Sequence, residues 1–175
     1  MTTTTERQAA ADVVPSEGLS AYAVPILRIS LGVIILATWW GNVQNDLYTG
    51  DGLTGLINWL FAEDGNGSTL GFYQSILEAV VVPAAGIIAP VQGVVEFLFG
   101  LGLLLGIFTR ASALAALGFF ITLFLGYFGG HEWIWTYVLL SAAAVTVFLG
   151  WGGRQLGVDQ FLAARRGSSP GGLLW

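Results

Sequence analysis

Two ionisable side chains, Arg28 and Glu96, lie inside long apolar stretches of the sequence. A charge near the centre of a bilayer costs at least about 2.5–3 kcal/mol, so such residues usually pair or face a polar cavity. At about 1.5 Å of rise per residue, the two residues differ by about 7 Å in depth, which an arginine side chain can span. We therefore expect Arg28 and Glu96 to pair or to share a polar pocket. The alternative is that Arg28 extends to the lipid head groups while Glu96 is protonated and bonded locally.

The residues around Glu96 indicate which face of its helix carries this pocket. Gln92, Glu96 and Gly100 recur every four residues, so they form one polar and narrow stripe along an α-helix. We expect the stripe to face other helices rather than lipid, with room beside its glycine for a ligand head group or water. Pro90 is expected to kink the same helix and to widen this space.

An aromatic pair, Trp39–Trp40, ends the first apolar stretch. The simplest interpretation is that both indoles anchor the chain at a membrane interface. The competing interpretation is an aromatic lining for a flat quinone ring, which stacks on such side chains. The candidates for a quinone or polar pocket are therefore Arg28, Glu96, Gln92, Trp39 and Trp40, and no catalytic residue is assigned.

The composition excludes several kinds of redox centre and one kind of partner. The chain has no cysteine, which excludes iron–sulfur clusters, thiolate zinc sites and thiol–disulfide catalysis by this chain alone. Its single histidine, His131, cannot supply a two-histidine haem or metal site, so we predict no metal and no haem. The net charge of −5 argues against nucleic acid as a partner.

The composition and the lengths of the apolar segments predict the structure that surrounds the candidate residues. The chain is 55% hydrophobic and only 10% charged, whereas a soluble domain has about 25% charged residues. Four apolar segments lie within or near the length of about 17–25 residues that spans hydrocarbon, at 21–40, 84–108, 111–128 and 133–150. We therefore predict an all-α fold, an integral membrane four-helix bundle over residues 21–151, with the lipid bilayer as its surroundings.

The connection between the first two predicted spans has a different pattern. Residues 53–61 and 69–82 each place apolar side chains on one helical face but are too short to span a membrane. We predict two amphipathic helices there, on the membrane surface or over the mouth of the bundle, with Pro83 ending or kinking the second. Residues 1–20 are predicted to be a disordered tail and residues 152–175 a cytoplasmic C-terminal tail.

The arginines predict the orientation of the chain in the membrane. No basic residue occurs between Asn42 and Thr109, although that stretch contains several acidic residues. Every arginine outside the predicted spans falls on one side of the membrane, and these residues are Arg7, Arg110, Arg154, Arg165 and Arg166. The positive-inside rule makes that side cytoplasmic, so we expect both termini in the cytoplasm and the protein in the cell (plasma) membrane.

Three stretches of the sequence resemble the DoxX/DoxD family of small membrane proteins. The first is the arginine-bearing LRISLGVIILATWW, and the second is VVEFLFGLGLLLGIFTR, similar to the family's glutamate, glycine-rich and threonine–arginine pattern. The third is GGRQLGVDQFL, similar to the family's glycine–arginine and glycine–hydrophobic–aspartate ending. The resemblance covers residues 24 to 166, and the long acidic insert after the first span makes the chain similar to the DoxD branch.

The resemblance implies a four-helix membrane bundle that is associated with respiratory or redox complexes. DoxD proteins are the large subunit of a thiosulfate:quinone oxidoreductase and pair with a separate DoxA subunit. The residues that match family motif positions are Arg28, Glu96, Arg110, Arg154 and Asp159. Among them, Arg110, Arg154 and Asp159 are expected to form a structural motif at the cytoplasmic rim, where Arg154 and Asp159 bond Arg110 and nearby backbone.

The leading hypothesis is a membrane subunit of a quinone-linked oxidoreductase, with quinone as its cofactor and a partner protein subunit supplying the redox centre. A quinone site needs an apolar slot and a few proton donors, which a helical bundle can provide. The alternative hypothesis is a non-catalytic scaffold or assembly subunit of a larger membrane complex. A small solute or proton transporter is disfavoured because the sequence shows no inverted repeat and only two intramembrane charges.

Overall fold

The computed structural model describes residues 20–150 and 156–159, and these residues are helical with no strand among them. The elements are α2 (Ser20–Gln44), α3 (Gly50–Phe61), α4 (Gly71–Ile76), the π-helical turn η1 (Leu77–Val81), the 3₁₀ turn η2 (Val82–Ala84), α5 (Ala85–Leu105), α6 (Thr109–Tyr127) and α7 (Trp135–Leu149). The expected all-helical fold is confirmed over this part of the chain. The predicted tails, 1–20 and 152–175, lie almost entirely outside the described residues.

Three helical stretches within the described residues are long and apolar enough to cross a membrane, which makes this a membrane protein. They are Tyr22–Gln44, Gly71–Leu105 and Thr109–Tyr127, with mean hydropathies of 1.8, 1.9 and 1.5. The fourth predicted span, 133–150, corresponds to α7, which is apolar but has only 15 residues. A helix of that length is shorter than the typical span of about 20 residues.

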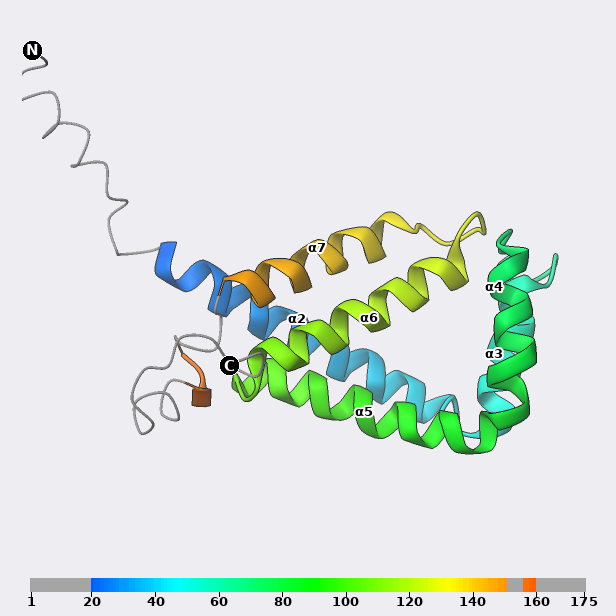
Figure 1. Ribbon diagram of the computed structural model, residues 1–175, viewed down its shortest axis with the longest axis horizontal. Coiled ribbons are helices and arrows are strands. Elements are labelled where there is room, and N and C mark those ends of the chain that lie inside the picture. Colours follow the sequence, from blue (N-terminus) through cyan, green and yellow to red (C-terminus); the bar gives the residue numbers. More distant parts are fainter. Residues whose placement is uncertain (1–19, 151–155, 160–175) are drawn as a thin grey trace, which may run out of the picture.

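The long helices run lengthwise, and the connection between the first two closes one end of the molecule. Figure 1 shows α2, α5, α6 and α7 along the long axis, while α3 and α4 stand across the end where α6 and α7 diverge from α2 and α5. Pro83 lies in η2, between α4 and α5, and its missing N–H and fixed φ suit a change of direction there. The amphipathic helix expected over 69–82 is divided at Ile76–Leu77 into α4 and the π-helical turn η1.

The core divides into two clusters. In the larger one, α2 packs against α5 and α6 packs against α7, and its buried residues are Leu31, Ile35, Phe99, Leu103, Ala113, Ala116, Phe120, Ala144 and Val147. The alanines on α6 and α7 let these two backbones approach closely, as small residues do between membrane helices. The smaller cluster joins α3 to the start of α5 through Leu53, Ile57, Ala85 and Ala89.

The crossing of α2 and α5 depends on Gly32. A Cβ atom added there would lie 2.6 Å from the backbone nitrogen of Leu104 and 2.8 Å from its Cα, both rigid parts of α5. By contrast, a Cβ added at Gly118, in the middle of α6, meets nothing within 4 Å. The two glycines therefore offer a matched pair, because each lies inside a helix but only one lies at a close contact.

We expect Gly32→Ala to lower the free energy of unfolding by about 1–3 kcal/mol, because the extra methyl group forces α2 away from α5. Gly118→Ala is expected to leave stability unchanged or to raise it by up to about 1 kcal/mol, since alanine favours a helix more than glycine does. Unfolding of the purified variants by a denaturing detergent, followed by circular dichroism, measures both changes. Equal effects of the two substitutions would contradict the close α2–α5 crossing.

Candidate functional site

Arg28 lies in α2, is fully buried, and binds backbone groups at the far end of α5. Its Nη1 donates to the carbonyl oxygen of Leu103 at 2.9 Å, and its Nη2 donates to the carbonyl oxygen of Leu156 at 2.8 Å. Leu103 is in the last turn of α5, where carbonyl groups lack partners inside the helix. Arg28 therefore links the end of α5 to the segment 156–159, which follows α7 in the sequence.

Asp159 completes this structure by binding the first backbone N–H groups of α6. Its two carboxylate oxygens accept hydrogen bonds from the nitrogens of Phe108 and Thr109, each at 2.9 Å, and its own nitrogen donates to the carbonyl of Gly106 at 2.9 Å. A carboxylate at a helix N-terminus satisfies N–H groups and interacts favourably with the helix dipole. Asp159 also interacts electrostatically with the Arg28 guanidinium. We call this arrangement, made of Arg28, residues 103–109 and residues 156–159, the α5–α6 corner.

Arg110, another residue of the expected rim motif, lies in the first turn of α6. The Arg110 guanidinium lies over the ring of Phe148, 4.5 Å from its centroid, and so joins α6 to α7. Arg154 lies outside the described residues. Asp159 binds nearby backbone, which is one part of what was expected for it.

Glu96 is fully buried in α5, and neither of its carboxyl oxygens has a hydrogen-bond partner among the described residues. The expected pair with Arg28 is wrong. Arg28 binds at the level of Leu103, seven residues further along α5, which corresponds to about 10 Å of helix rise. Side chains lean toward the N-terminus of their own helix, and because α2 and α5 run in opposite directions this lean separates the two charges. The alternative for Arg28 is also wrong, because its side chain does not reach the surface.

A cluster of aromatic and polar side chains lies beside Glu96. The Trp39 indole nitrogen donates to the carbonyl of Gly93 at 2.9 Å, and the Trp39 ring stacks on Tyr48 with centroids 6.5 Å apart. The Tyr48 ring covers Gly93 so closely that an added Cβ would lie 2.7 Å from it. The Tyr48 hydroxyl accepts a hydrogen bond from the Asn42 amide at 3.2 Å. These contacts hold the phenol of Tyr48 next to the α5 turn that carries Glu96.

Tyr48 interacts with Glu96 although no hydrogen bond joins them in this structure. Burial raises the pKa of the Tyr48 phenol above its ordinary value, the bond from Asn42 acts in the opposite direction, and the neighbouring Glu96 carboxyl raises it further. Tyr48, which lies in the polar turn between α2 and α3, was not among the residues expected at the site. Nothing in its local pattern distinguishes it from a tyrosine at a membrane interface.

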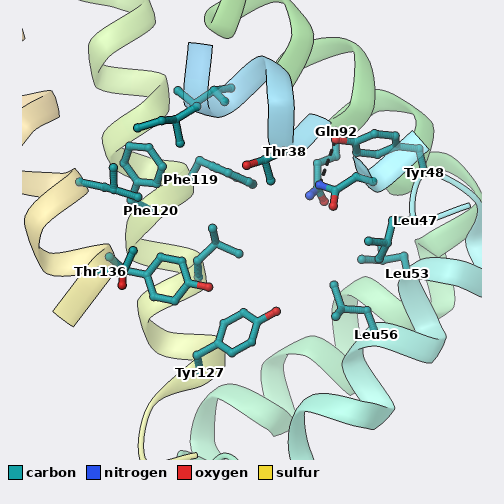
Figure 2. A pocket seen from close by; sticks show the side chains of 16 residues that line it. Thr38, Leu47, Tyr48, Leu53, Leu56, Gln92, Phe119, Phe120, Tyr127 and Thr136 are labelled. Carbon is teal, nitrogen blue, oxygen red and sulfur yellow. Dashed lines mark hydrogen bonds between the residues drawn. The ribbon is translucent and has the colours of Figure 1, made fainter. Parts of the chain in front are cut away.

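A cavity of about 320 Å³ lies between the two helix pairs and beneath α3. Its lining residues are Ile34, Ile35, Thr38, Asn42, Leu47, Tyr48, Leu53, Leu56, Gln92, Phe119, Phe120, Leu123, Tyr127, Thr136, Tyr137 and Leu140. Figure 2 shows Tyr48 and Gln92 on one wall and Tyr127 on the other, with the Tyr127 hydroxyl directed into the space between them. The walls are therefore mostly apolar, with hydroxyl and amide groups on opposite sides.

One of the five residues expected in a pocket lines this cavity. Gln92 lines it, whereas Arg28, Glu96, Trp39 and Trp40 are not among its lining residues. Trp39 supports Tyr48, which does line it, and Trp40 is 59% exposed on the outside of α2. Trp40 thus has the position of a lipid-facing or interfacial side chain rather than of a pocket wall.

A second cavity of about 220 Å³ adjoins the first. The two share the lining residues Leu53, Leu56, Gln92, Phe119, Leu123 and Tyr127. The second cavity is bounded further by α3, α4, η1, α5 and the C-terminal part of α6, mainly through aliphatic side chains such as Ile57, Leu77 and Ile88. An elongated molecule with a polar head and an apolar body fits these two spaces in sequence.

Comparison with known proteins gives one match. A family model described as DoxX matches residues 23–132, which include Arg28, Glu96, Arg110 and the cavity residues on α2, α3, α5 and α6. The match ends before α7, so Asp159 and the GGRQLGVDQFL segment lie beyond it, and the resemblance expected over residues 24–166 is confirmed only to residue 132. No match was found among curated proteins or among solved structures.

Proposed function

The chain belongs to the DoxX family, and from this premise we propose that it is the membrane subunit of a quinone-linked redox complex. In this proposal the head group of a quinone occupies the cavity of about 320 Å³ between the helix pairs. The observation that carries the proposal is the lining of this cavity, in which hydroxyl and amide groups stand on otherwise apolar walls. Its volume lies at the lower end of the range of about 300–1,000 Å³ that is usual for small-molecule sites.

The cavity residues fit the chemistry of such a ligand. The Tyr127 hydroxyl and the Gln92 amide, which reach the cavity from opposite sides, can each donate a hydrogen bond to one of the two oxygens of a quinone ring. The Phe119 and Phe120 rings offer apolar contact to the ring face. The adjoining aliphatic cavity suits the hydrocarbon tail of a lipid-soluble quinone.

The proposal includes the surroundings of the chain. We infer that α7 acts as a fourth span, which completes a four-helix membrane bundle in the plasma membrane with both termini in the cytoplasm. The chain has no cysteine and one histidine, so a partner subunit supplies the redox centre. The acidic connection between α2 and α5 favours the DoxD branch, and in that case the complex is of the thiosulfate:quinone type.

A cavity-filling substitution tests the proposal. Leu123 lines both cavities, and Leu123→Trp is expected to weaken binding of a short-tailed ubiquinone analogue by at least about tenfold, which corresponds to about 1.4 kcal/mol. Tyr127→Phe removes one hydroxyl and is expected to weaken binding by about three- to tenfold. Binding is measured by equilibrium titration of the purified full-length protein, and each variant is first checked for helical content.

Leu139→Trp is the matched control, because Leu139 is 72% exposed on α7 and lies away from both cavities. The same change of side chain there is expected to leave the affinity unchanged. An analogue without a tail is expected to bind more weakly than the tailed one to the wild-type protein. Absence of binding by the folded wild-type protein, or equal losses in both tryptophan variants, would overturn the proposal and favour the scaffold function.

A further inference from the structure

Glu96 is a buried carboxyl group to which the packing of the described helices supplies no regular hydrogen-bond partner. Its exposed fraction is zero, and neither oxygen has a hydrogen-bond partner among the described residues. Burying a polar group without a partner carries a free-energy cost, and burying a charged one costs far more. By contrast, Arg28 and Asp159, which are buried with similar completeness, are engaged by backbone groups at the α5–α6 corner. The hydrogen bonds among the described residues therefore do not explain why a carboxyl group stands at position 96.

Tyr48 lies between Glu96 and the cavity. It interacts with Glu96 on one side and lines the cavity on the other. Among the described residues, it is the one titratable side chain for which an interaction with Glu96 is found. Figure 2 shows the Tyr48 side chain beside Gln92 at the edge of the cavity.

The contacts of Tyr48 leave its hydroxyl proton available. The phenolic oxygen accepts the bond from Asn42, so the O–H group itself is free to donate in another direction. The ring is held in place by stacking on Trp39 and by its close approach to Gly93. Glu96 is one turn beyond Gly93 on α5, so a rotation of its side chain can bring its carboxyl group to the phenol.

We propose that Glu96 exchanges a proton with the cavity through the hydroxyl group of Tyr48. In the forward direction the O–H bond of the Glu96 carboxyl breaks and its proton moves to the Tyr48 oxygen. At the same time the Tyr48 O–H bond breaks and that proton passes to a negatively charged ligand oxygen in the cavity, which leaves Glu96 as a carboxylate. The reverse path restores the carboxyl proton, and no electron moves in either direction.

The use of this path for a quinone rests on the proposed function, but the path itself can be tested without a ligand. Infrared spectroscopy of the purified full-length protein detects the C=O stretch of a protonated carboxyl group, and transfer into D₂O shifts that band as the proton exchanges. We expect a band in the wild type that is absent from Glu96→Gln. We expect it to exchange at least about tenfold more slowly in Tyr48→Phe, a change of about 1.4 kcal/mol in the barrier.

Two further variants keep the test decisive. Tyr137→Phe removes another cavity hydroxyl for which no interaction with Glu96 is found among the described residues, and it is expected to exchange at the wild-type rate. Glu96→Asp retains a carboxyl group and is expected to show a shifted band, which identifies the signal if Glu96→Gln folds poorly. The proposed path would be overturned if the carboxyl band of Tyr48→Phe exchanged its proton as fast as that of the wild type. The absence of any band that depends on residue 96 would also overturn it. Because no quinone is present, this failure is distinguishable from a failure of quinone binding.

Discussion

Arg28→Ala is expected to lower the free energy of unfolding by about 3–5 kcal/mol, because the guanidinium makes two charge-assisted hydrogen bonds that are each worth about 1.5–3 kcal/mol. The substitution leaves the carbonyls of Leu103 and Leu156 without their partner and opens a void beside Gly106, whose missing side chain makes room for the Arg28 guanidinium. Detergent-induced unfolding of the purified protein, followed by circular dichroism, measures this loss.

Lysine at the same position separates the contribution of geometry from that of charge. Arg28→Lys keeps a positive charge but has a single nitrogen, which cannot reach both carbonyls with the planar fork of a guanidinium. We expect it to lose roughly half as much stability as Arg28→Ala. Full stability in Arg28→Ala would show that the α5–α6 corner does not depend on this side chain.

Asp159→Ala is expected to lower the free energy of unfolding by about 2–3 kcal/mol, since the carboxylate holds the first two N–H groups of α6. Asp159→Asn retains one acceptor oxygen and is expected to lose about half of that amount. The same unfolding experiment measures both variants, and Asp64→Asn, at an exposed position in the turn after α3, serves as the control with the same chemical change.

The stability losses caused by Arg28→Ala and Asp159→Ala are expected to be less than additive when the two substitutions are combined. Arg28 binds Leu156 and Asp159 binds Phe108 and Thr109, so either change releases the segment 156–159 from the same corner. Residues that share one network show coupling energies of about 0.5–3 kcal/mol in double-mutant cycles. A strictly additive double variant would contradict the view of the corner as one structural unit.

The α5–α6 corner changes the interpretation of the two intramembrane charges. The sequence suggested that Arg28 and Glu96 act together on a ligand, but the backbone of α5 and of residues 156–159 occupies Arg28. The ligand-binding candidates are instead uncharged groups, chiefly Tyr48, Gln92 and Tyr127. Glu96 lies beside the cavity without lining it, and in the path proposed above it reaches the cavity through Tyr48.

Helix N-caps show why sequence alone could not find the corner. A local cap is recognised by a serine, threonine, aspartate or asparagine just before the helix, but α6 follows Phe108, whose side chain makes no capping bond. The capping side chain comes from Asp159, which is about fifty residues later and beyond another helix. The left-handed backbone of Phe108, with φ of 48°, likewise follows from the way the corner is held rather than from the residue type.

Local composition and periodicity were enough to predict several properties of the chain. Long apolar segments predicted helices of membrane length, Pro83 predicted the change of direction before α5, and the absence of cysteine restricted the redox chemistry. These predictions need no knowledge of the tertiary structure. Segment hydrophobicity and the backbone restriction at proline depend on residues that are adjacent in the sequence, and the available metal ligands depend on residue types alone. The packing of the helices, which no local pattern reveals, separates Arg28 from Glu96, brings Tyr48 beside Glu96 and places Asp159 at the N-terminus of α6. Those contacts join residues from different helices and turns, so the packing of α2 on α5 and of the last segment on the corner selects them.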